Sequence, residues 1–290
     1  MAYRKILVPI FGSRRDQAAL EGAFGLAKQF GAHVEALFVR PDPVSGPPYG
    51  YLDGDFSGYA ARFAIEAAIK AGDAAQKAAT GTFDRTVDKC AIQVIEKPSE
   101  QREATAHLRI VEADFVAEIE RQSRLSDLIV FAASPTETEQ ASIQSGLESA
   151  LLSGARPVLF MPRDAKAVPG RRIAIAYDGS AAAAHAVTCA LPFLERASEL
   201  HAFEVTGEKS ATLSELQAYL TLRGLKVIEH VVDPGPKTTA EALMLAVTAK
   251  KCDTLVLGGY GHSRIRELVF GGVTRHVLTQ RTDVTVLMAH

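Results

Sequence analysis

Short apolar runs alternate along this chain with longer stretches whose apolar residues recur at helical spacing. The runs typical of strands lie at 4–10, 32–39, 126–131, 157–161, 171–177, 198–205, 252–257 and 284–288. The stretches typical of helices lie at 18–30, 60–79, 107–124, 181–194, 213–222 and 238–249. Strands that alternate with helices of this length pair in parallel through right-handed crossovers. We therefore predict an α/β fold with a doubly wound parallel sheet in each half of the chain.

The same pattern occurs twice in one chain. Each copy opens with an apolar run that ends in Gly-Ser and leads into an Ala-rich helix. The matched segments are 4–13 with 171–180, 32–39 with 198–205, 126–131 with 252–257, and 157–161 with 284–288. Four matches in the same order favour a tandem duplication over chance.

The repeat divides the chain into two predicted domains. The first covers residues 1–161, a linker rich in Pro, Lys, Arg and Asp covers 162–170, and the second domain covers 171–290. The stretch from Pro41 to Gly58 is rich in Pro and Gly and has no counterpart in the second copy. A tolerated surface insertion is the favoured interpretation, and a lid is the alternative.

The ends of the predicted strands in the second copy carry the candidate chemistry. In an open parallel sheet, ligands bind beyond the carboxyl ends of the strands, where the strand order reverses. Asp178-Gly179-Ser180 follows the first strand of this copy, Val205 ends the second, and Gly258-Gly259-Tyr260-Gly261 follows a later one. The ends of these three strands are therefore the predicted site.

Glycines near the end of the chain favour an anion as the ligand. Gly258, Gly261, Gly271 and Gly272 lack the Cβ atom that would keep main-chain amides away from phosphate oxygens. A helix predicted to begin near Val273 would add its N-terminal amides and the positive end of its dipole, and Thr274 would add a hydroxyl. Spaced glycines also form ordinary turns, so this pattern alone leaves both interpretations open.

These residues resemble the universal stress protein family. The resemblance rests on the strand-Asp-Gly-Ser-helix opening and on Gly258-x-x-Gly261 followed by Gly271-Gly272-Val273-Thr274. It covers both halves, so the chain resembles a tandem member with two Rossmann-like domains of the adenine nucleotide alpha hydrolase type.

The glycine pattern is similar to that of the nucleotide-binding branch, which binds ATP or AMP. The resemblance implies that Asp178 and Val205 contact the adenine, that Gly179 belongs to the same binding site, and that Gly258 and Gly261 line the ribose and phosphates. Gly271, Gly272, Val273 and Thr274 would hold the phosphates, and Mg²⁺ is compatible with such a site. The end strands of family members pair across a two-fold axis, which a tandem chain can do within itself. An additional homodimer is left open.

This chain departs from the family pattern in both halves. The nucleotide-binding branch usually has Ser or Thr where Gly272 stands, and losing one hydroxyl donor costs about 1 kcal/mol of phosphate binding. The first copy departs further, because Phe11, Ala132, Pro135 and Gln144 stand where the second has Asp178, Gly258, Gly261 and Gly271. Phe11 accepts no hydrogen bond, and Pro135 has no N–H. We therefore expect nucleotide only in the second half, with a structural role or an apolar ligand for the first.

Other motifs are weaker candidates. The run from Pro234 to Thr239 lacks the glycine that a P-loop needs before its lysine, so we predict a turn and helix cap there. Ser180 lacks the Gly-x-Ser-x-Gly context of a nucleophile and is expected to cap a helix. The eight histidines form no metal-binding motif, so no metal site is predicted. In the glycine loop, His262, Arg264 and Arg266 are either solvated residues or phosphate and partner contacts.

Composition narrows the class of protein. With 47% hydrophobic and 23% charged residues in 290, the chain can bury a substantial core. Its 32 basic and 34 acidic residues leave no excess to neutralise a nucleic acid. The three cysteines form no Cys-x-x-Cys pair, and neither a signal peptide nor a membrane-spanning run is evident. We expect a cytoplasmic protein.

The functional expectation is a stress-response protein with an adenine nucleotide as a regulatory ligand. No catalytic residue is assigned, because no general base or Mg²⁺-holding carboxylate is evident beyond Asp178. Two alternatives remain: a partner-binding scaffold without nucleotide, and a slow ATP hydrolase or other hydrolase that uses Ser180 or His262.

Overall fold

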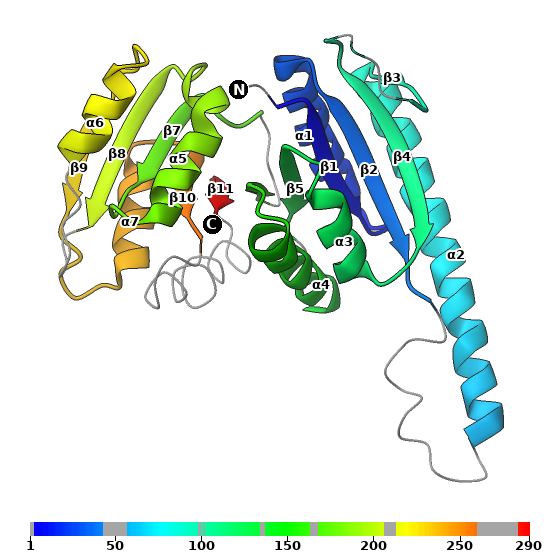
Figure 1. The fold of residues 1–290 in the computed structure, drawn as a ribbon. Helices are drawn as coiled ribbons and strands as arrows, with labels where there is room; N and C mark the ends of the chain where they lie inside the picture. Colours follow the sequence, from blue (N-terminus) through cyan, green and yellow to red (C-terminus); the bar gives the residue numbers. More distant parts are fainter. Residues whose placement is uncertain are drawn as a thin grey trace.

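One continuous sheet of eleven strands runs through the molecule (Figure 1). The computed structural model describes residues 3–42, 57–97, 100, 102–133, 137–162, 168–205, 213–259 and 284–290, with the backbone alone at 57–61 and 137–139. The strands are β1 (Lys5–Ile10), β2 (His33–Arg40), β3 (Gln93–Val94), β4 (Thr105–Glu112), β5 (Leu128–Ala132), β6 (Val158–Met161), β7 (Arg172–Ala176), β8 (Glu199–Val205), β9 (Ile228–Val232), β10 (Thr254–Gly258) and β11 (Thr285–Ala289). The helices are α1 (Asp16–Phe30), α2 (Ser57–Cys90), α3 (Phe115–Ser123), α4 (Glu137–Glu148), the π-helical turn η2 (Ser149–Ser153), α5 (Ala181–Leu194), α6 (Leu213–Thr221) and α7 (Thr239–Ala249).

The strand order repeats itself across the middle of the sheet. It runs β3-β4-β2-β1-β5-β6-β11-β10-β7-β8-β9, so β4-β2-β1-β5-β6 on one side corresponds to β9-β8-β7-β10-β11 on the other. Every pair within a half is parallel. The order reverses between β1 and β5 and again between β7 and β10, and these are the two positions where such sheets bind ligands. The predicted doubly wound α/β fold is thus confirmed.

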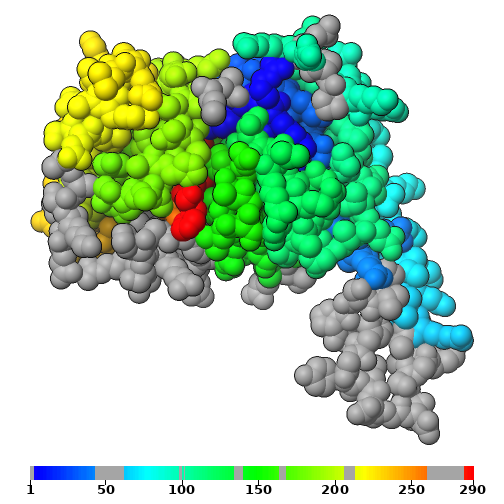
Figure 2. All heavy atoms as spheres, in the orientation of Figure 1, coloured from blue at the N-terminus to red at the C-terminus, as the bar shows by residue number. Residues whose placement is uncertain are grey.

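The two halves join through their last strands. β6 and β11 pair antiparallel, with Val286 opposite Phe160 and Met288 opposite Val158. The pairing that the family resemblance implied therefore occurs within this single chain and turns two sheets into one. Figure 2 shows the red atoms of β11 between the surfaces of the two halves.

Helices cover both faces of the sheet. On one face α1, α2, α5 and α6 pack against alternate strand residues such as Ile6, Val8 and Ile173. On the other face α3, α4, η2 and α7 cover the intervening residues, including Leu7 and Leu255. This alternation follows from the period of two along a strand.

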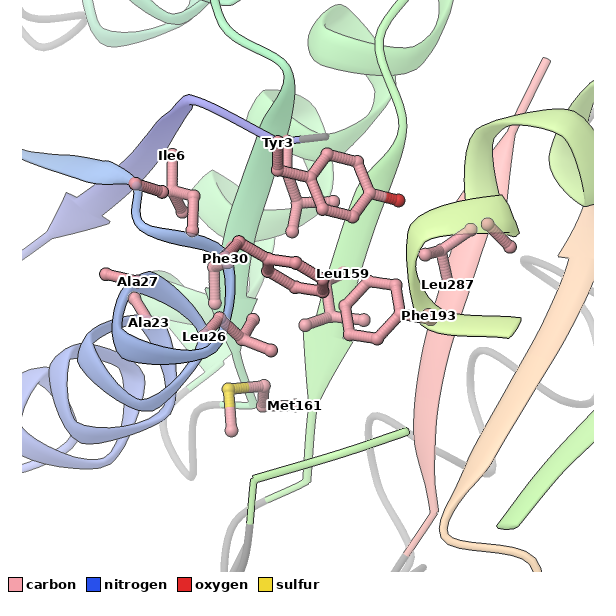
Figure 3. Packing of buried hydrophobic residues seen from close by; sticks show 14 of the residues in the cluster. Tyr3, Ile6, Ala23, Leu26, Ala27, Phe30, Leu159, Met161, Phe193 and Leu287 are labelled. Atoms are coloured by element: carbon pink, nitrogen blue, oxygen red, sulfur yellow. The ribbon is translucent and has the colours of Figure 1, made fainter. Parts of the chain in front are cut away.

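An aromatic cluster packs across the junction of the halves (Figure 3). The Tyr3 ring centroid lies 5.2 Å from that of Phe30 and 5.4 Å from that of Phe193 on α5, and Phe30 and Phe193 are 5.3 Å apart. The Tyr3 hydroxyl donates to the main-chain oxygen of Cys189 at 2.5 Å. Burial raises the pKa of Tyr3 well above its ordinary value, so the phenol keeps this proton.

One motif of the repeat has the same function in both halves. The Asp127 carboxylate accepts from the amides of Arg4 and Lys5 at 2.7 and 2.9 Å. The Asp253 carboxylate likewise accepts from the amides that lead into β7, Arg172 among them at 2.9 Å. Each aspartate thereby satisfies the first amides of the central strand of its half.

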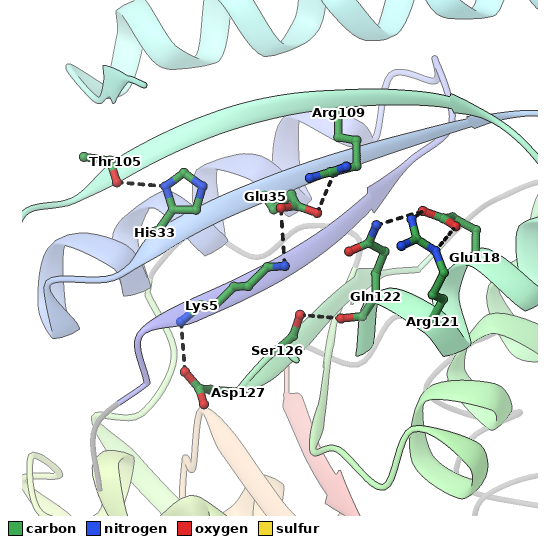
Figure 4. A network of polar contacts seen from close by, with 10 residues as sticks. All are labelled: Lys5, His33, Glu35, Thr105, Arg109, Glu118, Arg121, Gln122, Ser126 and Asp127. Atoms are coloured by element: carbon green, nitrogen blue, oxygen red, sulfur yellow. Dashed lines mark hydrogen bonds and ion pairs between the residues drawn. The ribbon is translucent and has the colours of Figure 1, made fainter. Parts of the chain in front are cut away.

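The face of β1, β2 and β4 near Asp127 carries a polar network (Figure 4). Glu35 is 4% exposed and accepts Lys5 at 3.3 Å and Arg109 at 3.0 Å. Two cations thus compensate one buried carboxylate, as burial of a charge requires.

Several element predictions were wrong in detail. The helix predicted over 107–124 is a strand, β4, followed by α3, because Ala106, Leu108 and Ile110 alternate with polar residues at period two. Asp114 separates the two elements by accepting from the Ala117 amide at 2.8 Å, as a helix cap does. β9 and α4 had no prediction. The helix predicted at 60–79 is the first part of α2, which begins at Ser57, so Gly58 does not belong to the Pro-rich excursion.

Candidate functional site

The carboxyl ends of β7, β8 and β10 form the edge of the sheet where the sequence predicts the ligand site. Ala176 pairs with Phe203, so two residues further along, Asp178 after β7 and Val205 at the end of β8 lie at the same height on neighbouring strands. On the other side of β7, Val256 pairs with Ile175, which places Gly258 beside Tyr177. Asp178, Val205 and Gly258, which the sequence places in the predicted site, therefore lie close together where the strand order reverses for the second time.

The turn after β7 is shaped for the start of α5. Gly179 has φ 73°, a left-handed conformation that favours glycine. Asp178 is exposed, and its Oδ1 accepts from the Ser180 amide at 3.0 Å. The Ser180 hydroxyl accepts from the Ala183 amide at 3.1 Å, so the predicted capping role of Ser180 is confirmed. Asp178 therefore closes this turn while its carboxylate stays at the surface.

Gly258 allows β10 to touch the start of α5. A Cβ at Gly258 would lie 2.5 Å from the main-chain nitrogen of Ala183 and 2.7 Å from the main-chain carbon of Ala182. Gly259 is also buried, yet a Cβ there would meet its nearest neighbour at 3.6 Å. The glycine at 258 is thus required by packing, and the same packing brings the helix N-terminus to this edge.

Burial and nearby negative charges change the pKa of Tyr177, which follows β7 at this edge. The pKa of Tyr177 is raised, first by burial and then by the negative charges of Glu215 and Asp178. The phenol therefore stays protonated at neutral pH.

The equivalent turn of the first half is occupied by a side chain of the protein itself. Gly12 has φ 75°, like Gly179, and the turn points its amides inward. The Asp16 carboxylate accepts from the amides of Phe11, Gly12 and Ser13 at 3.0, 2.7 and 3.0 Å and is 3% exposed. The second half has Ala183 at the position of Asp16, so it lacks this side chain, and Asp178 accepts only from the Ser180 amide in its turn.

Other groups fill the space around the first turn. The Arg15 guanidinium donates to the main-chain oxygen of Ala133, which follows β5, so this side chain bridges the ends of β1 and β5. Phe11 stacks on Phe115 with ring centroids 5.3 Å apart. A Cβ at Gly12 would meet the main-chain oxygen of Ala75 on α2 at 2.2 Å, so the long helix lies directly against the turn.

Part of the predicted phosphate site lies outside the described residues. This holds for Gly261, Gly271, Gly272, Val273 and Thr274. It also holds for His262, Arg264, Arg266 and Pro135, and for 163–167 of the predicted linker. Gln144 lies in α4 and donates to Glu148 within that helix at 3.3 Å.

Sequence reasoning missed Asp16 and Arg15. One signal for Asp16 was available, because Ser13-x-x-Asp16 is the spacing at which an acidic side chain turns back to amides at a helix start. For Arg15 no local signal existed, since its acceptor lies 118 positions along the chain.

One weaker motif behaves as predicted. Thr238 caps α7, and Glu241 reaches back to the Thr238 amide at 3.0 Å, so the run after Pro234 is a turn and capping box. Within the described ranges, His, Cys, Asp and Glu side chains form no group of three suited to a metal ion. Within the same ranges, no helix combines the length and apolarity needed to span a bilayer.

Comparison with known proteins identifies the family. The model of the universal stress protein family matches residues 2–161, which is more than half of the chain. The chain therefore belongs to the universal stress protein family. Universal stress protein Slr1230 of Synechocystis sp. is 30% identical over 159 residues, a region that covers 51% of this chain and 52% of that protein. The chain thus spans about half the length of this curated relative.

Solved structures share the fold along nearly the whole chain. A universal stress protein from Archaeoglobus fulgidus aligns with a TM-score of 0.65 at 16% identity, covering 98% of this chain and 95% of that one. A structure from Pseudomonas aeruginosa UCBPP-PA14 described by the same family name aligns with a TM-score of 0.53 at 16% identity, covering 99% and 93%. At this identity the likeness shows the arrangement of strands and helices.

Proposed function

We propose that this universal stress protein binds one adenine nucleotide, ATP or AMP, at the carboxyl edge of its second half. The nucleotide acts as a regulatory ligand. Asp178 and Val205 contact the adenine, Gly179 shapes the turn beside them, and Gly258 with Gly261 lines the ribose and phosphates. The phosphates themselves are held by Gly271, Gly272, Val273 and Thr274.

The observation that carries this proposal is the difference between the two reversals of strand order. At the first, Asp16 occupies the amides of the turn and Arg15 bridges β1 to β5. At the second, Ala182 and Ala183 stand at the positions of these two residues, and Gly258 is the last residue of β10. Without the aspartate no acceptor at this position competes with a ligand anion, and without the arginine no side chain at this position bridges the strand ends. A helix N-terminus beside open strand ends favours binding of an anion.

In this proposal the two halves on either side of the linker have different functions. Residues 1–161 form a half without nucleotide, 162–170 connect, and 171–290 form the nucleotide-binding half. The equivalent roles of Asp127 and Asp253 support two repeats of one unit. We expect the protein in the cytoplasm, with its two halves as a dimer-like pair.

The test is to release and identify whatever small molecule purifies with the protein. Denaturation followed by chromatography is expected to yield adenine nucleotide from the wild type and much less from an Asp178→Ala variant. Absence of nucleotide, together with no binding of added ATP or AMP, would favour the scaffold. Accumulation of ADP from added ATP that is lost in a His262→Ala variant would favour the hydrolase.

A further inference from the structure

The main chain of Gly259 is held at both of its polar groups by the end of β11. Its amide donates to the Ala289 oxygen at 2.7 Å, and its oxygen lies 2.9 Å from Nδ1 of His290. A carbonyl oxygen only accepts, so His290 carries its proton on Nδ1 and donates it. The Gly259 carbonyl belongs to the peptide unit that leads into the glycine-rich stretch, and its direction is therefore set by His290.

A second histidine supports the first. Nδ1 of His185 on α5 donates to the main-chain oxygen of His290 at 2.7 Å. Nε2 of His185 lies 3.3 Å from Sγ of Cys189. Burial raises the pKa of Cys189 to about 11, so the thiol keeps its proton and donates it to this nitrogen. His185, His290 and Gly259 form a chain of bonds from α5 through the end of β11 to the end of β10, which we call the histidine clamp.

The first half holds the equivalent carbonyl in another way. The Ala133 amide donates to the Met161 oxygen at 3.0 Å, as Gly259 does to Ala289. The Ala133 oxygen, however, accepts from Arg15, whose side chain arrives from the β1 side. In the second half the donor arrives from β11, on the opposite side of β10 from β7. The clamp thus fixes the carbonyl without placing a side chain between the ends of β7 and β10.

We propose that His290, supported by His185, is a positioning residue that fixes the Gly259 peptide, from which the chain continues to the residues proposed to bind phosphate. This inference rests on the proposed function. Main-chain amides bind an anion well only when their orientation is set before binding, because ordering them afterwards consumes binding energy. Loss of the clamp therefore weakens contacts to phosphate and leaves contacts at Asp178 and Val205 unchanged.

The test compares ATP with adenosine, which has no phosphates. Titration calorimetry is expected to show that His290→Ala weakens ATP binding about three- to tenfold, the effect of one hydrogen bond. Adenosine, which has only the ribose near Gly261 and no phosphates, is expected to be weakened much less. His290→Asn keeps a donor at a similar position and is expected to restore most of the loss. His185→Ala is expected to act in the same direction with a smaller effect. His107→Ala, on β4 of the first half, is the matched control and is expected to change neither ligand.

The outcomes separate the clamp from the proposed function. A wild type that binds neither ATP nor adenosine refutes the proposed function. The clamp is then judged by hydrogen exchange of the Gly259 amide, which is expected to speed up in His290→Ala and recover in His290→Asn. An unchanged ratio of ATP to adenosine affinity in a wild type that binds both overturns the inference. Unchanged exchange of the Gly259 amide in His290→Ala overturns it as well.

Discussion

Gly258 at the end of β10 approaches Ala183 at the start of α5 so closely that a Cβ on the glycine would lie 2.5 Å from the alanine nitrogen. Both partners are main chain, so neither can move by changing a rotamer. Gly258→Ala is expected to destabilise the protein by about 1–3 kcal/mol, as overpacking of a tight contact does. Chemical denaturation followed by circular dichroism measures this loss.

Gly259→Ala is the matched control for that variant. Its Cβ would meet its nearest neighbour at 3.6 Å, and Gly259 is outside the left-handed region. A change within about 0.5 kcal/mol is expected. Equal losses in the two variants would contradict the account of the close approach.

Asp16 is expected to contribute more to the free energy of unfolding than an ordinary helix cap does. Asp16→Ala leaves three half-buried amides without their acceptor, which predicts a loss of about 2–3 kcal/mol in the free energy of unfolding. Asp114→Ala removes an exposed cap with one amide and is expected to cost about 1 kcal/mol. If urea denaturation gives similar values for both variants, the Asp16 carboxylate is not the anion that fills the first turn.

Two histidines at the outer edge of the second half predict a dependence of stability on pH. Nδ1 of His201 lies 2.9 Å from Nε2 of His230, and Nε2 of His201 is at 3.0 Å from Glu199, outside hydrogen-bond geometry. Burial is the main cause that lowers the pKa of both imidazoles, and the cations of Arg172 and Lys250 add to it for His201. Glu199 opposes this shift.

The sign of the effect follows from the lowered pKa values. The unfolded chain takes up these protons near the ordinary pKa of 6.5, and the folded protein only at lower pH. The histidines therefore contribute stability above pH 6.5 that is lost as the pH falls toward the folded values. Denaturation midpoints at pH 7.5, 6.5 and 5.5 are expected to decline. A His201→Gln, His230→Gln double variant is expected to flatten the decline, and an equally steep slope would contradict the assignment.

The aromatic cluster is expected to stabilise the joined halves. Phe193→Ala removes a fully buried ring that touches Tyr3 and Phe30, which predicts a loss of about 3–5 kcal/mol. Tyr3→Phe removes only the hydroxyl bond to Cys189 and is expected to cost about 1 kcal/mol. The chain has no Trp, so circular dichroism is the suitable probe. A Phe193→Ala loss no larger than that of Tyr3→Phe would show that the cluster contributes little.

Most strands of the central sheet could be predicted from the sequence, because they are continuous apolar runs. Ile6, Leu7 and Val8 are fully buried on both faces, which is the situation such runs predict. β9 could not be predicted from the sequence because it is a short outer strand. Glu229 and His230 interrupt its apolar residues. The sequence of β4 predicts a helix because a mixed run such as Thr105–Glu112 fits both periods over a short window.

The candidate site was predictable only where local chemistry specifies it. Asp178-Gly179-Ser180 is a local turn, and its turn and cap could be predicted from three neighbouring residues. The bond from Arg15 to Ala133 and the bond from His290 to Gly259 join residues far apart in sequence. Such contacts depend on strand order, which periodicity alone does not provide.

Stoichiometry of nucleotide binding tests the central claim most directly. Titration calorimetry of the whole chain with ATP, and separately with AMP, is expected to give one site per chain. Binding is expected to be lost in a Gly261→Pro variant that keeps the wild-type circular dichroism spectrum, because proline removes an amide from the glycine loop. Two equal sites, no site, or binding unaffected by Gly261→Pro would contradict nucleotide binding confined to the second half.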